Sequence, residues 1–183
     1  MTPTSQQDPI VRQEGAAVGP RRAVAMSPAK RLALDGLLVA LSVVGSLIKI
    51  PSALGTPAFD SLPGYFGAAA LGVSDGALVA AVGHLATAAT AGFPLTVPIH
   101  LLVAAMMAVA AAVFGWTARR WPVLAALLAV LVNGVVAPAV FILIPQFGLA
   151  FFIGAVPALT VASALNVGGA LLLYLGHRRR PLF

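Results

Sequence analysis

Long apolar runs alternate with short polar or Pro/Gly-rich breaks from about residue 30 to residue 180. Each run approaches the roughly 20 residues that an α-helix needs to cross the hydrocarbon core of a bilayer. The breaks predict six helices, near Leu32–Ile50, Ser61–Gly72, Ala77–Ala91, Val97–Trp116, Val123–Ile144 and Leu149–Leu175. The second and third are short for a full crossing, and Pro138 predicts a kink in the fifth.

The breaks between these runs have the composition of loops. Pro51–Asp60 is polar and rich in Pro and Gly, Val73–Gly76 contains the turn dipeptide Asp-Gly, and two further breaks are Gly92–Thr96 and Pro145–Gly148. Six spans of about 20 residues leave about five residues for each loop, whereas seven spans would leave almost none. The fold class expected is therefore an all-α, polytopic membrane protein with six transmembrane helices.

Residues 1–29 differ from the rest of the chain. They carry charges, Pro, Gln and Gly, and they lack the apolar core of a cleavable signal peptide. We expect residues 1–29 to be a disordered cytosolic tail and residues 30–180 to be one six-helix transmembrane domain.

The positive charges predict the orientation of the chain. With six crossings and a cytoplasmic N-terminus, the C-terminus is also cytoplasmic, and ten of the 11 Lys and Arg residues lie inside. Only Lys49 then lies outside. This asymmetry follows the positive-inside rule and would be lost with five crossings.

Composition excludes several classes of protein. The chain has 183 residues, of which 60% are apolar and 9% charged, with a mean hydropathy of +1.00; a soluble domain has about 25% charged residues. The net charge is +6, but the basic residues flank apolar runs and form no patch with interleaved aromatics, so no nucleic-acid partner is expected. Cysteine is absent, which excludes disulfides and thiolate chemistry in this chain. The location expected is the cell membrane, with multiple passes through the lipid bilayer.

Polar residues at membrane depth are the candidates for function, because ionisable groups are costly in a bilayer. In the predicted topology, Asp60, His100 and Gln146 lie near the outer face, and His84, Asn133 and Asn166 lie deeper. Together they outline a polar pocket open to the outside. Structural roles are alternatives: Asp60 can cap the second helix, the asparagines can join helices, and a buried histidine can be satisfied within the core.

Catalytic and metal motifs are not found in the sequence. It contains no GxSxG, Walker A or HExxH motif and no pair of carboxylates or His/Asp/Glu cluster with metal spacing. We therefore expect no catalytic residue, no metal site and no cofactor. A separate feature is the small-residue stripe of Ala33, Gly36 and Ala40, which permits close approach of another helix, although such stripes are common in Ala-rich helices.

Two stretches resemble a known family. Ile48–Gly72 resembles the first loop and second helix of the substrate-binding membrane subunits, or S components, of energy-coupling factor (ECF) vitamin transporters, and Gly83–Leu95 resembles their third helix and loop. The resemblance covers roughly Lys30 to Arg180. Within the family, Phe59–Phe66 with Gly83-His84 and Pro98–His100 is most similar to the subfamily that takes up α-ribazole, a cobamide precursor. Thr2 stands where cobalt and nickel S components carry the histidine of an N-terminal Met-His metal ligand, which argues against a metal as substrate.

The resemblance implies an uptake function without chemistry in this chain. An S component binds a vitamin-like molecule from outside and works with a membrane coupling protein and two ATPase subunits. The family's coupling contact maps onto Ala33, Gly36 and Ala40. Its binding site maps onto Asp60, Phe93, His100, Asn133 and Gln146, to which polarity adds His84 and Asn166, and aromatic character adds Phe59 and Tyr65.

The chemistry of the substrate suits these residues. A ribosyl-benzimidazole offers an aromatic plane for Phe59, Tyr65 and Phe93, and hydroxyls for the polar groups. The alternatives are an S component for another vitamin, a pyrimidine or a queuosine precursor, a stand-alone secondary transporter, and an intramembrane enzyme or scaffold. A secondary transporter would need a mid-membrane ion site, whereas Asp35, the sole carboxylate well within a predicted helix, lies near the inner face.

Overall fold

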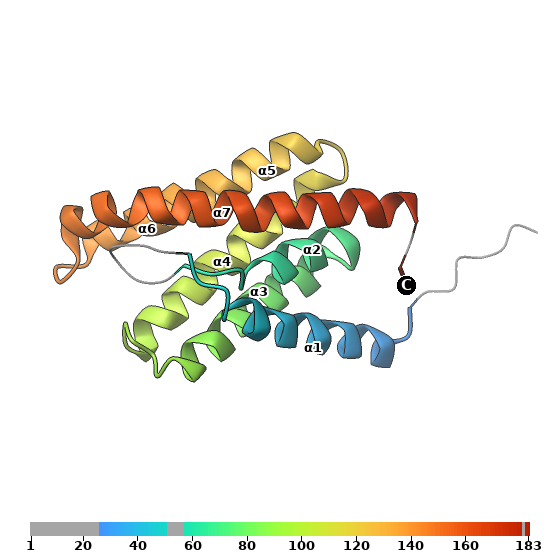
Figure 1. Cartoon of the computed structure of the whole chain (residues 1–183), viewed down its shortest axis with the longest axis horizontal. Coiled ribbons are helices and arrows are strands. Elements are labelled where there is room, and N and C mark those ends of the chain that lie inside the picture. Colours follow the sequence, from blue (N-terminus) through green and yellow to red (C-terminus); the bar gives the residue numbers. More distant parts are fainter. Residues whose placement is uncertain (1–25, 51–56, 181) are drawn as a thin grey trace, which may run out of the picture.

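The computed structural model describes residues 26–50, 57–180 and 182–183. These residues form a bundle of helices (Figure 1), and within the described ranges no strand is present, which confirms the all-α prediction. The helices are α1 (Pro28–Gly45), α2 (Leu62–Ala70), α3 (Val73–Thr90), α4 (Val97–Ala118), α5 (Pro122–Leu131), the π-helix η2 (Val132–Val136), α6 (Ala137–Val140), the 3-10 helix η3 (Phe141–Leu143) and α7 (Gly148–Arg179). Most of the predicted tail, residues 1–25, lies outside the described residues.

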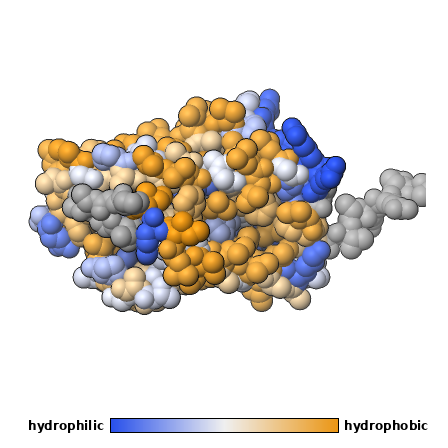
Figure 2. Space-filling view, in the orientation of Figure 1, coloured by the Kyte–Doolittle hydropathy of each residue, from blue (hydrophilic) through white to orange (hydrophobic). Residues whose placement is uncertain are grey.

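Among the residues that the structure describes, three helical segments are long and apolar enough to cross a membrane: Val97–Ala118, Pro122–Leu143 and Gly148–Arg179. The outward surface of the bundle is largely apolar, as Figure 2 shows for one face. Large apolar side chains such as Trp116 and Leu143 are each 83% exposed. A surface of this kind is stable against lipid and would be unfavourable in water.

Helix α1 begins earlier and ends earlier than the apolar pattern predicts. Ser27 accepts a hydrogen bond from Lys30 N (3.3 Å) and caps the helix, with Pro28 in its first turn. The prediction that this helix continues to Ile50 was wrong, because residues 48–50 pair with residues 57–59. Ile50 N donates to Pro57 O (2.7 Å), and Phe59 N donates to Ile48 O (3.3 Å).

The prediction of a turn at Val73–Gly76 was also wrong, because these residues form the first turn of α3. Asp75 lies at the third position of α3, where a negative charge is favourable at a helix N-terminus. Its two carboxylate oxygens accept from Nε and Nη2 of Arg31, which joins α3 to α1. Only Leu71 and Gly72 separate α2 from α3.

The break between α3 and α4 is the one that the Gly-Phe-Pro sequence predicts. Phe93 N donates to Ala88 O (2.8 Å), and Gly92 N donates to Ala89 O (3.1 Å), which together form a Schellman motif. Gly92 takes the positive φ of +76° that this motif needs. Phe93 and Thr96 also have positive φ, 50° and 75°, so the short connection is conformationally constrained.

The irregularity predicted at Pro138 takes the form of the π-helix η2. Pro138 has no N–H, so the carbonyl of Gly134, four residues earlier, loses its α-helical donor. Thr160 Oγ1 of α7 donates to Gly134 O instead (3.3 Å). The two helices approach closely here, because a Cβ at Gly134 would lie 2.8 Å from the Cα of Thr160.

Helix α2 lies inside the bundle. Residues 63–69 are all buried, and the helix contacts α1, α3, α4 and α7. Ala68 is the meeting point of three helices, since a Cβ added at Gly76 of α3 or at Gly115 of α4 would overlap it. Small residues therefore set the spacing of α2, α3 and α4.

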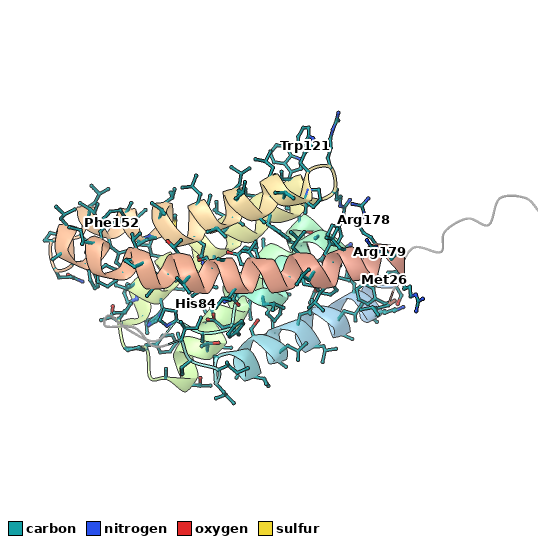
Figure 3. The ribbon with its side chains drawn as sticks, turned by 45° about the horizontal axis from the view of Figure 1, so that its top comes forward. Met26, His84, Trp121, Phe152, Arg178 and Arg179 are labelled. Atoms are coloured by element: carbon teal, nitrogen blue, oxygen red, sulfur yellow. The ribbon has the colours of Figure 1, made fainter. Side chains whose placement is uncertain are left out.

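The turns gather at two ends of the bundle. Figure 1 shows the first turn of α1, the α2–α3 and α4–α5 connections, and the last turn of α7 at one end. Figure 3 places Met26, Trp121, Arg178 and Arg179 at this end, whereas Phe152 lies at the other. Basic residues thus accumulate at one end, which we call the basic end.

Candidate functional site

The Asp60 segment (residues 58–62) is held by one side chain of α7. Asn166 Oδ1 accepts from Leu62 N (2.9 Å), and Asn166 Nδ2 donates to Ala58 O (2.8 Å) and to Ala162 O (2.9 Å). Asn166 is 1% exposed, so these bonds form away from water and lipid. The side chain predicted as a substrate contact therefore fixes the backbone on both sides of Asp60.

The end of α1 supports the same segment. A Cβ at Gly45 would overlap the carbonyl of Phe59, so only glycine allows this approach. The backbone hydrogen bonds between residues 48–50 and residues 57–59, an isolated antiparallel bridge, hold the segment from a third direction. Asp60 is thereby presented on a fixed backbone, although it lies outside any helix.

The Asp60 carboxyl is partly buried, near Lys49. Burial raises the pKa of Asp60 to about 6, while backbone hydrogen bonds and the Lys49 charge act to lower it. A partly desolvated carboxylate is a strong hydrogen-bond acceptor for hydroxyl groups. Ser61, and not Asp60, occupies the N-cap position of α2, so the structure does not use Asp60 as a cap there.

Helices α3 and α4 bring two predicted histidines together. His84 Nε2 and His100 Nδ1 are 3.1 Å apart, and His100 Nε2 accepts from Leu95 N (3.3 Å). Phe93 packs edge-on against His100, with ring centroids 5.7 Å apart. No spacing in the sequence pairs these residues. The turn between α3 and α4 brings them together by returning the chain antiparallel.

A second polar contact joins the π-helix to α7. Asn133 Nδ2 donates to Ser163 Oγ (2.8 Å), one turn from the Thr160–Gly134 bond. Ser163 and Thr160 were missed from the sequence because hydroxyl residues in an apolar helix carry no signal by themselves. The backbone carbonyl released by Pro138 is the feature that points to Thr160.

The remaining predicted residues occupy different surroundings. Tyr65 is 1% exposed and packs edge-on against Phe114 (5.6 Å between centroids), with its hydroxyl buried and lacking a protein partner in the described part of the chain. Phe59 belongs to the Asp60 segment. Gln146 is exposed in the turn before α7, next to a packed cluster of Phe141, Phe147 and Phe151.

The structure thus assembles the predicted residues into groups. One is the Asp60 segment with Asn166, the second is Phe93 with the two histidines, and the third is Asn133 with α7. Figure 3 shows His84 away from the basic end of the bundle. Two surface hollows lie elsewhere, at Arg120–Leu124 and beside Trp116, and neither is lined by a predicted site residue.

The described residues contain no group of three or more His, Asp or Glu side chains that could hold a metal ion. The polar groups found are suited to hydrogen bonding and the rings to stacking, which are means of binding an uncharged organic molecule.

The small-residue stripe of α1 faces outward. Ala33, Gly36 and Ala40 are exposed, and a Cβ at Gly36 would meet no atom within 4 Å. The opposite face of α1, with Asp35, Leu38 and Ser42, is buried. The stripe is therefore accessible to a further helix.

Comparison with known proteins gives one match. The family model described as "ECF transporter, substrate-specific component" matches residues 30–177. Neither the curated proteins nor the solved structures yielded a match.

Proposed function

Because the chain belongs to the ECF transporter substrate-specific component family, it is a membrane-embedded, substrate-binding transporter subunit, and we propose that its substrate is α-ribazole. Members of this family are transporter subunits that partner with the ECF module, a membrane coupling protein and ATPases. ATP hydrolysis belongs to those partners.

The resemblance of Phe59–Phe66, Gly83-His84 and Pro98–His100 to the α-ribazole subfamily carries the substrate proposal. The geometry supports it, because these stretches contribute a fixed acid, a histidine pair and aromatic rings. α-Ribazole needs such a set, since it joins an aromatic benzimidazole to a ribose with several hydroxyls.

Each group has a distinct part in the proposed binding. Phe59 and Phe93 pack against the benzimidazole, with Tyr65 as a further aromatic neighbour. Asp60 accepts from ribose hydroxyls, and Asn133 and Gln146 add hydrogen bonds at the other side. A ligand without those hydroxyls would leave the Asp60 carboxylate with fewer hydrogen-bond partners in the bound state, which costs affinity.

We propose six membrane crossings for this domain. Helix α2 has nine residues, about 14 Å of helix, against a hydrocarbon core of about 30 Å. Its burial by α1, α3, α4 and α7 supports the proposal, since a segment enclosed by protein need not be a full lipid-facing helix. Helices α1 and α3, with 18 residues each, reach about 27 Å.

The proposed orientation places the basic end in the cytoplasm. The positive-inside rule supports it, because Lys30, Arg31, Arg119, Arg120 and the basic last turn of α7 all belong to this end (Figures 1 and 3). The Asp60 segment and the α3–α4 turn then face outward, where substrate arrives.

We further propose that Ala33, Gly36 and Ala40 contact the coupling protein. Their exposure and the free space above Gly36 support a close helix contact on this face. The buried face of α1 carries the intramolecular packing, so the two roles do not compete.

The test is ligand-induced thermal stabilisation of the purified protein in detergent, with α-ribazole in a panel of vitamins, pyrimidines and queuosine precursors. A ligand at 100 times its Kd adds about 2.7 kcal/mol to the free energy of unfolding. A shift with α-ribazole that is lost in Asp60→Ala and kept in His177→Asn, which alters a histidine at the basic end, supports the proposal. A shift with a different compound alone would overturn the substrate, and no shift with any compound would count against binding of this class.

A further inference from the structure

The two histidines form a hydrogen-bonded series whose direction is fixed at one end by the backbone. Leu95 N–H can only donate, so His100 Nε2 must be an unprotonated acceptor (3.3 Å). A neutral imidazole with a bare Nε2 carries its proton on Nδ1. His100 Nδ1–H therefore donates to His84 Nε2, 3.1 Å away.

The same logic determines the second ring. His84 Nε2 accepts from His100, so the proton of a neutral His84 lies on its other nitrogen, Nδ1. The series runs from Leu95 N–H through His100 to His84, and it ends in a single N–H donor. His84 is only partly buried, whereas His100 is 6% exposed, so the free end of the series is the more accessible ring.

Four features hold the Leu95 N–H and the His100 ring in place. The Schellman motif ends α3, Thr96 N donates to Phe93 O (2.9 Å), and His100 N donates to Thr96 O (3.1 Å). Phe93 packs edge-on against the His100 ring. The backbone N–H of Leu95 cannot act as an acceptor, and the two rings are constrained. Every hydrogen bond in the series is therefore donated in the same direction, from Leu95 toward His84.

We propose that His84 Nδ1–H is a fixed donor that recognises an acceptor-only nitrogen of the substrate, namely the unsubstituted ring nitrogen of benzimidazole. The assignment rests on the proposed function for the identity of the ligand. One benzimidazole nitrogen carries the ribose, and the other has a lone pair and no hydrogen, so it complements a donor and repels a second acceptor. His84 is then a specificity residue and His100 a positioning residue that sets its proton.

The first measurement reads the histidine tautomers without any ligand. In protein labelled with ¹⁵N-histidine, His100 and His84 should both show the Nδ1–H form, with assignments from His84→Asn, His100→Asn and His177→Asn. Binding of α-ribazole should then shift the Nδ1 resonance of His84 and leave that of His177 unchanged. An Nε2–H form of His100 would overturn the proposal.

The second measurement compares α-ribazole with its analogue in which the unsubstituted ring nitrogen is replaced by C–H. The analogue keeps the shape, the aromatic plane and the ribose. We expect it to bind about tenfold more weakly or worse, because the His84 donor loses its partner. Equal affinities would overturn the proposal even if α-ribazole is the correct substrate.

The third measurement separates recognition from structural support. Asn places its amide near the position of histidine Nδ1, whereas Gln places its amide near Nε2. We expect His84→Asn to retain more affinity than His84→Gln, because Asn keeps a donor at the Nδ1 position that is proposed to contact the ligand. A purely structural role, in which His84 only contacts His100, predicts the reverse order and would overturn the proposal.

Failure of the proposed function is distinguishable from failure of this inference. If a different compound binds, the tautomers in the free protein and the order of the two His84 variants with that compound still decide the role of His84. A compound whose binding leaves the His84 Nδ1 resonance unchanged would overturn it.

Discussion

Asn166 offers the sharpest test of how the binding region is held together. Replacing it in Asn166→Leu keeps a similar volume and removes three hydrogen bonds. Ala162 O lies within α7 and keeps its intrahelical donor, so it loses little. The substitution leaves Ala58 O and Leu62 N without their hydrogen-bond partner. Of the two bonds lost, the one to Ala58 O is buried.

The magnitude follows from these two groups. A buried polar group left unsatisfied costs about 1–3 kcal/mol. Since the Leu62 bond is only partly buried, we expect a total loss of about 2–4 kcal/mol in the free energy of unfolding. For a chain of this length, about 1 kcal/mol corresponds to roughly 2–4 °C, so Tm should fall by roughly 4–16 °C.

The assay is thermal unfolding in detergent without ligand, with Asn133→Ala as the matched control. Within the described part of the chain, the Asn133 side chain makes one hydrogen bond, to Ser163 Oγ, and that hydroxyl can turn to a carbonyl of its own helix. The control should therefore lose about 1 kcal/mol or less. Equal Tm values for Asn166→Leu and Asn133→Ala would refute the reasoning.

Three further outcomes are expected. Gly134→Ala should lower Tm because its Cβ would lie 2.8 Å from Thr160 Cα, whereas Gly168→Ala, with nothing within 4 Å, should be neutral or raise Tm. Equal effects would contradict the close approach of η2 and α7. Because burial raises the pKa of Asp60 to about 6, ionisation opposes folding above that pH, and the opposition is relieved as pH falls toward about 4. The Tm of the unchanged protein should therefore rise as pH falls from about 6 to about 4, and this rise should be smaller in Asp60→Asn. The same pH dependence of Tm in both proteins would count against the raised pKa. Gly36→Leu should reduce uptake in cells with the ECF module while substrate affinity is unchanged, and Gly176→Leu, also exposed with free space, should leave uptake intact; loss of affinity in Gly36→Leu would argue against a coupling role.

Much of the fold is predictable from the apolar pattern, because the helices end at residue types, Pro and Gly, that disfavour helix. Pro and Gly terminate helices wherever they occur in Gly92–Thr96 and Pro145–Gly148, and α4 and α7 begin within one residue of the predicted positions. The ends of α1 and the start of α3 were mispredicted. They depend on tertiary contacts, the pairing of residues 48–50 with 57–59 and the Arg31–Asp75 ion pair, which no local pattern contains.

The candidate site was only partly accessible from sequence. Polarity at membrane depth selected His84, His100 and Asn166, but it could not show that the histidines share a hydrogen bond or that Asn166 binds the backbone of residues 58–62. Those relations require the helix packing. Whether each predicted residue contacts substrate stays a prediction for the binding experiments.

The crowding at Ala68 bears on how mutational scans of this protein should be interpreted. Gly76 and Gly115 each admit no side chain because the alanine of α2 fills the space, so any larger residue at these three positions must separate helices. In a growth selection for nutrient uptake, they will be depleted as strongly as true ligand contacts. Measuring the amount of folded protein in the membrane alongside growth will divide the two sets, since variants at the junction lose abundance while binding-site variants retain it.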